Sequence, residues 1–233
     1  MKTIILSGGL GTRISEETET KPKPMVLIGD KPLLWHIMNI YASQGFDDFI
    51  IATGYKGEII HDWVSSLKTN WKITPFDTGL DTQTGGRIRK CMGLVPGERV
   101  MATYGDGLAN IDLSKLVTFH DKQGKLATVT AVRPPARFGV LKSENGLVVS
   151  FGEKRQSDTG WINGGFFVFE PEVKFQIKNI FEPLETGVLP KLVEKVQLSA
   201  YEHEGFWQPM DTLREKQILA ELSQSVAPPW LDF

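Results

Sequence analysis

The chain has 233 residues, of which 41% are apolar, and a formal net charge of −2. This length is enough to bury one large hydrophobic core, and α/β proteins of this size commonly form a single domain. The nearly balanced charge and the lack of a long Lys/Arg block argue against nucleic acid or an anionic membrane as the main partner. No apolar run in the sequence approaches the roughly 18 residues of a membrane span.

Cys91 is the single cysteine, so no internal disulfide can form. The first residues lead into an apolar, β-branched run and not into the core of a signal peptide. We therefore expect a protein of the reducing cytoplasm.

The alternation of strands and helices predicts the fold class. Apolar runs at 3–6 and 49–53 predict strands. Apolar residues at helical spacing follow each run, over 33–41 and 59–67. This repeat indicates an α/β protein with a Rossmann-like, mixed but mainly parallel sheet flanked by helices. Further elements are expected as strands at 71–76, 100–104 and 126–132, a helix that begins near Arg87 and a helix over 113–120.

The character of the sequence changes at Arg133, which is followed by two prolines and by shorter apolar runs. These runs, at 138–141, 147–151 and 162–169, predict a smaller, more antiparallel region that elaborates the sheet. The last part of the chain is expected to form a helix over 188–195, a strand over 196–201, a helix over 213–223 and an apolar tail that docks on this or another subunit.

A glycine-rich loop, Gly8-Gly9-Leu10-Gly11-Thr12-Arg13, follows the first predicted strand. Glycines let the backbone approach a ligand closely, and its N–H groups form a nest for phosphate oxygens. The guanidinium of Arg13 adds a permanent charge. The loop could instead be an ordinary turn. It is not a Walker loop, which ends in Gly-Lys-Ser/Thr, and the dinucleotide fingerprint needs a third glycine where Ile14 stands.

Two aspartates stand where a hydrated cation could bind. Asp106 lies between two glycines directly after the strand expected at 100–104, at the edge where ligands bind in open α/β sheets. Asp211 precedes the helix expected over 213–223. The residues alone leave alternatives open, because Asp106 could cap a turn and Asp211 could satisfy the free N–H groups of that helix.

The glycine loop, followed by Lys21-Pro22-Lys23-Pro24-Met25, resembles the signature of the sugar-1-phosphate nucleotidyltransferases. The resemblance implies one domain over 1–233, with a nucleotide-binding core over 1–132 and a sugar-binding and C-terminal part over 133–233. Segments that look like the cytidylyltransferase branch of this family are spread over nearly the whole chain, at 35–38, 84–87, 104–107, 162–167 and 210–212.

The resemblance also implies roles for the charged residues. Arg13 and Lys23 would stabilise charge on a nucleoside triphosphate, and Mg²⁺ held by Asp106 and Asp211 would bridge its phosphates. The loop over 78–87 would border the base, although the composition of residues 77–86 also suits a surface connection. The other implied nucleotide-binding residues are Leu6, Gly8, Gly9, Gly11, Thr12, Thr78, Gly79, Thr84, Gly85, Gly86 and Gly105.

For the sugar phosphate, the resemblance implies a pocket lined by Gly139, Glu153, Lys154 and Asn163. Lys154 would hold the attacking phosphate and is the third implied catalytic residue. From the residues alone, Glu153 and Lys154 could be a solvated pair. The family's Glu-Lys-Pro is here Glu-Lys-Arg, and the loss of the proline at Arg155 frees the backbone next to Lys154.

A second departure from the family is a segment between Trp63 and Phe76 that looks a couple of dozen residues shorter. Any contact between subunits that other members of the family make there would differ in this chain.

The implied activity joins CTP and α-D-glucose 1-phosphate, giving CDP-glucose and pyrophosphate by in-line attack on the α-phosphorus. The partners are then these small molecules, and further copies of the chain in a homo-oligomer. UTP, dTTP or another sugar 1-phosphate stay open as substrates. The alternative from another class is a non-catalytic, sugar-nucleotide-binding regulatory subunit, but such a protein would typically lose the charged residues that this chain keeps.

Overall fold

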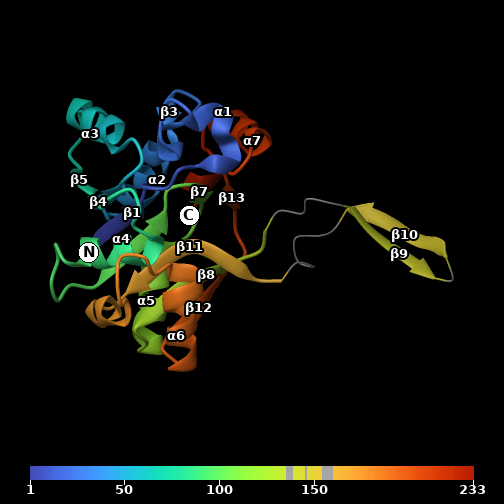
Figure 1. Cartoon of the computed structure of the whole chain (residues 1–233). Helices are drawn as coiled ribbons and strands as arrows, with labels where there is room; N and C mark the ends of the chain where they lie inside the picture. The colour runs from blue at the N-terminus through green and yellow to red at the C-terminus, as the bar shows by residue number, and fades with distance from the viewer. Residues whose placement is uncertain (135–138, 145, 154–159) are drawn as a thin grey trace.

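The computed structural model describes residues 1–134, 139–144, 146–153 and 160–233. Its centre is a seven-stranded sheet with the strand order β12-β8-β11-β6-β1-β4-β5 (Figure 1). β11 runs antiparallel to both of its neighbours, and the other pairs are parallel, which confirms the mixed, mainly parallel sheet. The strands are β1 Lys2–Leu6, β4 Asp48–Thr53, β5 Lys72–Asp77, β6 Val100–Tyr104, β8 Ala127–Val132, β11 Ile162–Phe169 and β12 Leu198–His203.

Each central strand is apolar on both faces because successive side chains point to opposite sides of the sheet. Ile5 and Ile51 belong to one hydrophobic core, and their neighbours Ile4 and Ile50 belong to the other. A strand buried on both faces has a continuous apolar sequence, which is why these strands were recognisable from sequence.

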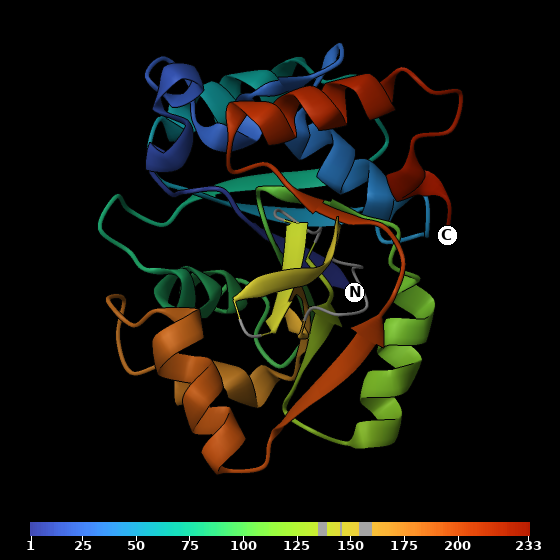
Figure 2. The same cartoon turned by 90° about the vertical axis from the view of Figure 1, so that its right-hand side faces the viewer.

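Helices cover both faces of the sheet, and Figure 2 shows α2, α3 and α7 on one side with α4 and α6 on the other. Apolar residues of the first group pack in the core that contains Ile5, and those of the second group pack in the core that contains Ile4. The helices are α2 Leu33–Ala42, α3 Gly57–Ser66, α4 Thr84–Met92, α5 Leu113–Gln123, α6 Leu189–Glu194 and α7 Leu213–Ser223.

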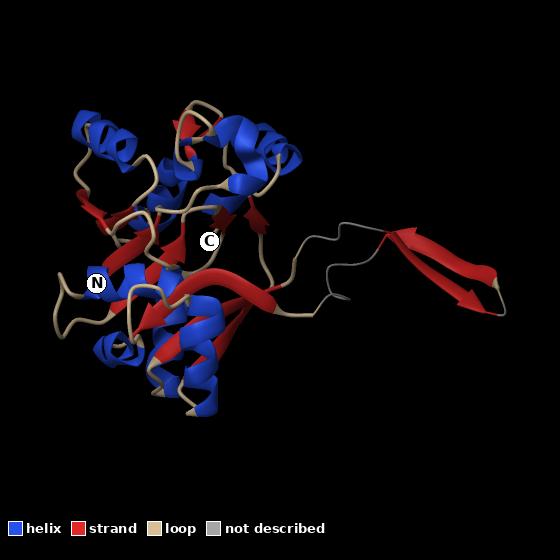
Figure 3. Ribbon diagram, in the orientation of Figure 1, coloured by secondary structure: helices blue, strands red, loops and turns tan. Residues whose placement is uncertain are grey.

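Shorter elements complete the described chain. β9 Gly139–Glu144 and β10 Leu147–Glu153 pair as an antiparallel hairpin (Figure 3). The remaining pieces are α1 Ser15–Thr18, β2 Leu27–Ile28, β3 Lys31–Pro32, β7 Gly107–Ala109, β13 Trp207–Pro209, the 3-10 helices Thr12–Ile14, Lys23–Met25, Pro171–Gln176 and Pro229–Leu231, and the π-helix Leu184–Val188. In the part of the chain that the structure describes, no helix has the length and apolar character needed to cross a membrane.

The predicted start of the helix near Arg87 was wrong. The helix expected to begin near Arg87 begins at Thr84, so Gly85 and Gly86 are helical and do not belong to the preceding loop. The reason is tertiary packing, because a Cβ added to Gly85 would lie 2.6 Å from the carbonyl oxygen of Glu182, and one added to Gly86 would clash with the backbone of Ile180. Glycine lets α4 approach that segment closely, and this contact outweighs its low helix propensity.

The C-terminal tail docks on its own chain. Trp230 is fully buried, and its ring lies edge-on to that of His36, 5.4 Å away between centroids.

Candidate active site

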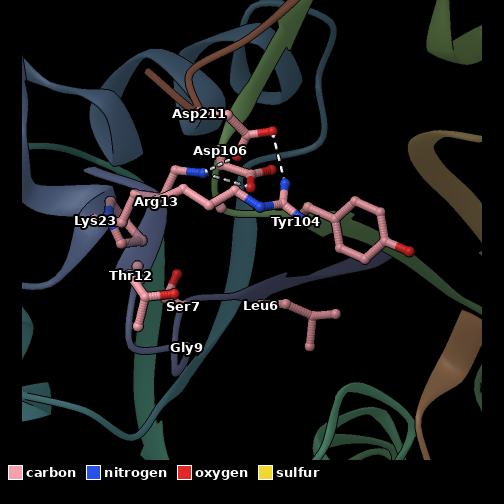
Figure 4. Close-up of a pocket in the computed structure, with 12 residues that line it drawn as sticks. Leu6, Ser7, Gly9, Thr12, Arg13, Lys23, Tyr104, Asp106 and Asp211 are labelled. Carbon is pink, nitrogen blue, oxygen red and sulfur yellow. Dashed lines mark hydrogen bonds and ion pairs between the residues drawn. The ribbon is translucent and has the colours of Figure 1, made fainter. Parts of the chain in front are cut away.

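The candidate site lies where β1 and β6 end side by side. The two strands are parallel, and Leu6 pairs with Tyr104 at their carboxyl ends. The glycine loop continues from β1, and Gly105 and Asp106 continue from β6. Between them lies a cavity of about 290 Å³, which is lined by Leu6, Ser7, Gly9, Gly11, Thr12, Arg13, Lys23, Pro24, Tyr104, Gly105, Asp106 and Asp211 (Figure 4).

Lys23 connects the two aspartates at the wall of this cavity. Its ammonium donates to Oδ2 of Asp106 at 2.9 Å and to Oδ1 of Asp211 at 2.7 Å. Arg13 donates to the other oxygen of Asp211, Oδ2, at 3.0 Å. Figure 4 shows these side chains converging from separate segments of the chain. The structure thus brings together all four charged residues that the sequence singled out for the triphosphate and the metal.

A small antiparallel sheet brings the two aspartates to the same place. β7 follows Asp106, β13 precedes Asp211, and the strands pair with Pro209 opposite Gly107. The backbone N–H of Met210 donates to the carbonyl of Asp106 at 2.8 Å. Residues that are about a hundred positions apart in sequence therefore lie next to each other.

The carboxylate of Asp211 is free of helix capping. α7 is capped by Thr212, whose side chain accepts from the backbone N–H of Glu215, and the carboxylate of Glu215 accepts from the backbone N–H groups of Thr212 and Asp211. This is a capping box. The alternative that Asp211 serves as the cap of this helix is therefore wrong.

The charges in this cluster stabilise one another. Burial on its own lowers the pKa of Lys23, but the carboxylates of Asp106 and Asp211 outweigh it, and the pKa lies above its ordinary value. Burial likewise raises the pKa of Asp211, but the hydrogen bond and charge of Lys23, together with Arg13, bring it below its ordinary value. Both groups are therefore charged near neutral pH.

The pair of carboxylates is suited to a divalent cation. Their oxygens converge on one point, which the ammonium of Lys23 marks. Mg²⁺ is commonly held by one or two carboxylates, with water and substrate phosphates completing its octahedron. Among the described residues, no group of three or more His, Cys, Asp or Glu side chains could hold a metal. Asp106 and Asp211 fit a cation that is shared with a phosphate-bearing ligand.

A second cavity, of about 380 Å³, lies on the other side of the glycine loop. It is bordered by that loop and by the start of α4. Its lining consists of Leu6, Gly8, Gly9, Leu10, Gly11, Thr12, Leu80, Thr82, Gln83, Thr84 and Arg87.

Arg87 ties the walls of the second cavity together. Its buried guanidinium donates to the carbonyls of Gly8 at 3.0 Å, Thr53 at 2.8 Å and Leu80 at 3.2 Å, and to the hydroxyl of Thr78. Burial lowers its pKa. A Cβ at Gly8 would clash with the guanidinium, so a side chain at this position would push Arg87 away from these partners.

Four predicted nucleotide-binding residues lie apart from the described linings of both cavities: Thr78, Gly79, Gly85 and Gly86. Thr78 is buried, and its hydroxyl donates to the carbonyl of Thr53 at 2.6 Å. Gly79 has a φ of +89° and its N–H donates to Asp77, which makes it the turn after β5. Gly85 and Gly86 pack against the segment that contains Ile180 and Glu182.

The residues predicted for the sugar phosphate are only partly placed. Asn163, in β11, donates through Nδ2 to the hydroxyl of Tyr104 at 3.0 Å and so adjoins the first cavity. Gly139 in β9 lies opposite Glu153 in β10. Lys154 and Arg155 lie outside the described residues.

The sequence reasoning assigned no role to several lining residues. Tyr104 and Arg87 stood within the motifs at 104–107 and 84–87, and those motifs are the signal that could have found them. Ser7 carries no such signal, because small polar residues in turns are common.

Comparison with known proteins is consistent with this geometry. Residues 2–225 match the nucleotidyl transferase family model. The glucose-1-phosphate cytidylyltransferase of Salmonella typhi is 44% identical over 253 residues, which cover 99% of this chain and 98% of that protein. The probable glucose-1-phosphate cytidylyltransferase of Bacillus subtilis (strain 168) is 42% identical over 236 residues, covering 92% of each.

Solved structures share the fold. HddC from Yersinia pseudotuberculosis complexed with GMP-PN has a TM-score of 0.76 at 24% identity, covering 94% of this chain and 98% of that one. A UDP-glucose pyrophosphorylase complexed with UDP-glucose has a TM-score of 0.73 at 17% identity, covering 94% of this chain and 97% of that one. With the family match over residues 2–225 and relatives above 40% identity along the chain, this protein belongs to the nucleotidyl transferase family.

Proposed function

We propose that this chain joins CTP and α-D-glucose 1-phosphate to give CDP-glucose and pyrophosphate. The observation that carries the proposal is the convergence of Lys23, Arg13, Asp106 and Asp211 beside the glycine loop. The choice of substrates is supported by the 44% identity to the cytidylyltransferase of Salmonella typhi.

The triphosphate would lie along the glycine loop. Backbone N–H groups between Gly8 and Gly11 would donate to its phosphate oxygens, and Arg13 and Lys23 would stabilise the charge that builds up as pyrophosphate leaves. Arg13 is largely exposed beside the cavity, so its guanidinium can turn from Asp211 to a phosphate without leaving a buried charge unpaired. The base would enter the second cavity, on the other side of the loop.

Asp106 and Asp211 would hold Mg²⁺ in this proposal. When bound, Mg²⁺ supplies charge neutralisation between phosphate oxygens. The ammonium of Lys23 would then turn from the two carboxylates to the phosphates, which exchanges one set of anionic partners for another.

The sugar phosphate needs orientation more than chemical activation. Its phosphate oxygen attacks the α-phosphorus in line, so no protein nucleophile is required. Asn163 would contact sugar hydroxyls, with Glu153 and the backbone at Gly139, and Lys154 would hold the attacking phosphate. The division into a nucleotide-binding part over 1–132 and a sugar-binding part over 133–233 belongs to the same proposal, as do a cytoplasmic location and assembly into a homo-oligomer.

Phosphorus-31 NMR of the purified chain with CTP, α-D-glucose 1-phosphate and Mg²⁺ tests this function. The proposal predicts equal growth of CDP-glucose and pyrophosphate signals as both substrates disappear. Parallel runs with UTP or dTTP test the alternative substrates. A chain that binds CDP-glucose but forms no pyrophosphate from any pair would be a regulatory subunit instead.

A further inference from the structure

One carboxylate, that of Glu185, connects the linings of both cavities. Tyr104, from the first cavity, donates its phenol proton to Oε1 of Glu185 at 2.6 Å. Thr84, from the second cavity, donates its hydroxyl proton to Oε2 at 2.8 Å. Figure 4 shows the hydroxyl of Tyr104 pointing away from Lys23 and the two aspartates. Glu185 stands in the π-helix Leu184–Val188, and the mechanism above gives it no role.

The chemistry of Glu185 fixes the direction of the hydrogen bonds beyond it. An ionised carboxylate only accepts, and a phenol has one proton to donate. Because the phenol donates that proton to Glu185, the oxygen of Tyr104 acts as the acceptor for Nδ2 of Asn163, 3.0 Å away. Oδ1 of Asn163 accepts from the backbone N–H of Gly165 at 2.8 Å, which agrees with the same orientation of the amide.

Other contacts hold the ring of Tyr104 in place. Glu185 therefore sets the direction in which the hydroxyl proton of Tyr104 points, and not the position of the ring. The ring packs edge-on against Phe167, with 5.7 Å between centroids. Gly165 has a φ of +81°, and a Cβ there would clash with the ring.

A purely structural role does not explain Glu185. Its side chain is exposed, where a hydrogen bond adds little to stability. Glu182, three residues earlier, has the structural role in this segment, because it pairs with Lys191 and accepts from the backbone N–H of Lys178 at 2.7 Å. Glu185 instead reaches out of the segment to β6 and α4.

We propose that Glu185 is a positioning residue for the sugar 1-phosphate, which sets the direction of the hydrogen bonds from Tyr104 to Asn163. The inference rests on the proposed function, in which Asn163 contacts the sugar. With that direction fixed, Asn163 has one N–H of Nδ2 and one lone pair of Oδ1 left for sugar hydroxyls. Without the acceptor at Glu185, the phenol can donate to Oδ1, and the amide can turn to an orientation that mismatches the sugar.

The test compares Glu185→Leu, which removes the acceptor, with Glu185→Gln, which keeps one acceptor oxygen. For Glu185→Leu we expect the KM for α-D-glucose 1-phosphate to rise about tenfold, the loss of one well-placed hydrogen bond. The KM for CTP should stay within about twofold. The KM of Glu185→Gln for α-D-glucose 1-phosphate should lie between the values of Glu185→Leu and the wild type. Glu182→Leu is the matched control, for which we expect a lower melting temperature and unchanged KM values.

Coupling to Tyr104 gives a second measurement. In a double-mutant cycle, Glu185→Leu should add nothing to the effect of Tyr104→Phe, because the phenol proton is already gone. Additive effects would overturn the proposal. So would unchanged KM values in Glu185→Leu, or an equal rise in both KM values.

Calorimetric binding of α-D-glucose 1-phosphate, with α,β-methylene-CTP present, separates this inference from the proposed function. If the wild-type chain binds the sugar phosphate but makes no CDP-glucose, the proposed reaction fails, and the Kd of Glu185→Leu still decides the role of Glu185. A tenfold weaker Kd supports that role, and an unchanged Kd overturns it. If the wild-type chain does not bind the sugar phosphate, both proposals are overturned.

Discussion

The ammonium of Lys23 lies 2.7 Å from Oδ1 of Asp211, and Asp106 accepts from the same ammonium at 2.9 Å. The side chain of Lys23 is only 11% exposed, so without a metal it is the cation that keeps the two carboxylates together. A divalent ion would compete with it for the same oxygens. The state of Lys23 should therefore be coupled to the binding of metal and triphosphate.

The first prediction concerns Lys23→Met, which removes the ammonium at nearly constant length. Without metal, the two carboxylates are left facing each other, and we expect the free energy of unfolding to fall by about 1–3 kcal/mol. Added Mg²⁺ should restore more stability to this variant than it adds to the wild type, because it replaces the missing cation. Thermal unfolding across a Mg²⁺ titration, without nucleotide, measures both effects. An identical response to Mg²⁺ in the two proteins would contradict the coupling.

For catalysis, we predict that Arg13→Ala and Lys23→Met each lower kcat/KM by about 10²–10³, the usual effect of losing one donor to a developing charge. Circular dichroism spectra and gel-filtration profiles that match the wild type would show that the fold is intact. Near wild-type turnover in both variants would remove the glycine loop and its charges from the mechanism.

Asp106→Asn and Asp211→Asn test the metal assignment. Each replaces a charged oxygen ligand by a neutral one of the same shape, so we expect metal to bind about 100-fold more weakly or worse. Electron paramagnetic resonance of Mn²⁺, with a triphosphate present, measures this affinity directly. Wild-type affinity in Asp106→Asn would show that the metal binds elsewhere.

A pH prediction comes from His120, which is buried between α5 and β8. Nδ1 of His120 lies 2.7 Å from the hydroxyl of Thr128, and burial lowers its pKa below the ordinary value. The unfolded chain therefore binds a proton near pH 6.5 that the folded chain binds only at lower pH, so stability falls as the pH drops below about 6.5. His120→Gln should flatten the decline between pH 7 and 5. Urea unfolding at several pH values measures the free energy of unfolding. The same dependence of this free energy on pH in His120→Gln and the wild type would contradict the role of His120.

Backbone conformation gives a third pair of variants. Val196 has a φ of +55°, which is unfavourable for a β-branched residue, and it is exposed after α6. Val196→Gly should raise the free energy of unfolding by about 1 kcal/mol. Gly124 has a φ of +57° with open space around it. Gly124→Ala should therefore lower the free energy of unfolding by about 1–2 kcal/mol, because alanine is strained at a positive φ. Chemical denaturation measures both, and the same sign for the two changes would contradict the argument.

The sequence predicted the parts of this fold that depend on local pattern. β6 and α7 have the predicted bounds, because an apolar run and a helical spacing of apolar residues are both visible within a short stretch of sequence. The start of α4 was missed, since Gly85 and Gly86 are helical only through their packing on the segment around Ile180. Long-range contacts of this kind leave no local signal.

In the site, too, residues within local motifs were predicted, and contacts between distant parts of the chain were not. Arg13, Lys23, Asp106 and Asp211 were recognisable from motifs, and the structure brings them together. Arg87 was expected only as the last residue of the loop that borders the base, and Glu185 was given no role, because their partners are backbone carbonyls or distant side chains that the fold alone brings near.

The central claim is that this chain uses CTP and α-D-glucose 1-phosphate as its substrates. The most direct test is kcat/KM for CTP, UTP, dTTP and GTP, each with saturating α-D-glucose 1-phosphate and Mg²⁺. A pocket that hydrogen-bonds the cytosine amino group rejects uracil strongly, since the wrong base leaves buried polar groups unpaired. We predict the highest kcat/KM for CTP, with the other triphosphates well below it. A higher value for any other triphosphate would contradict the claim.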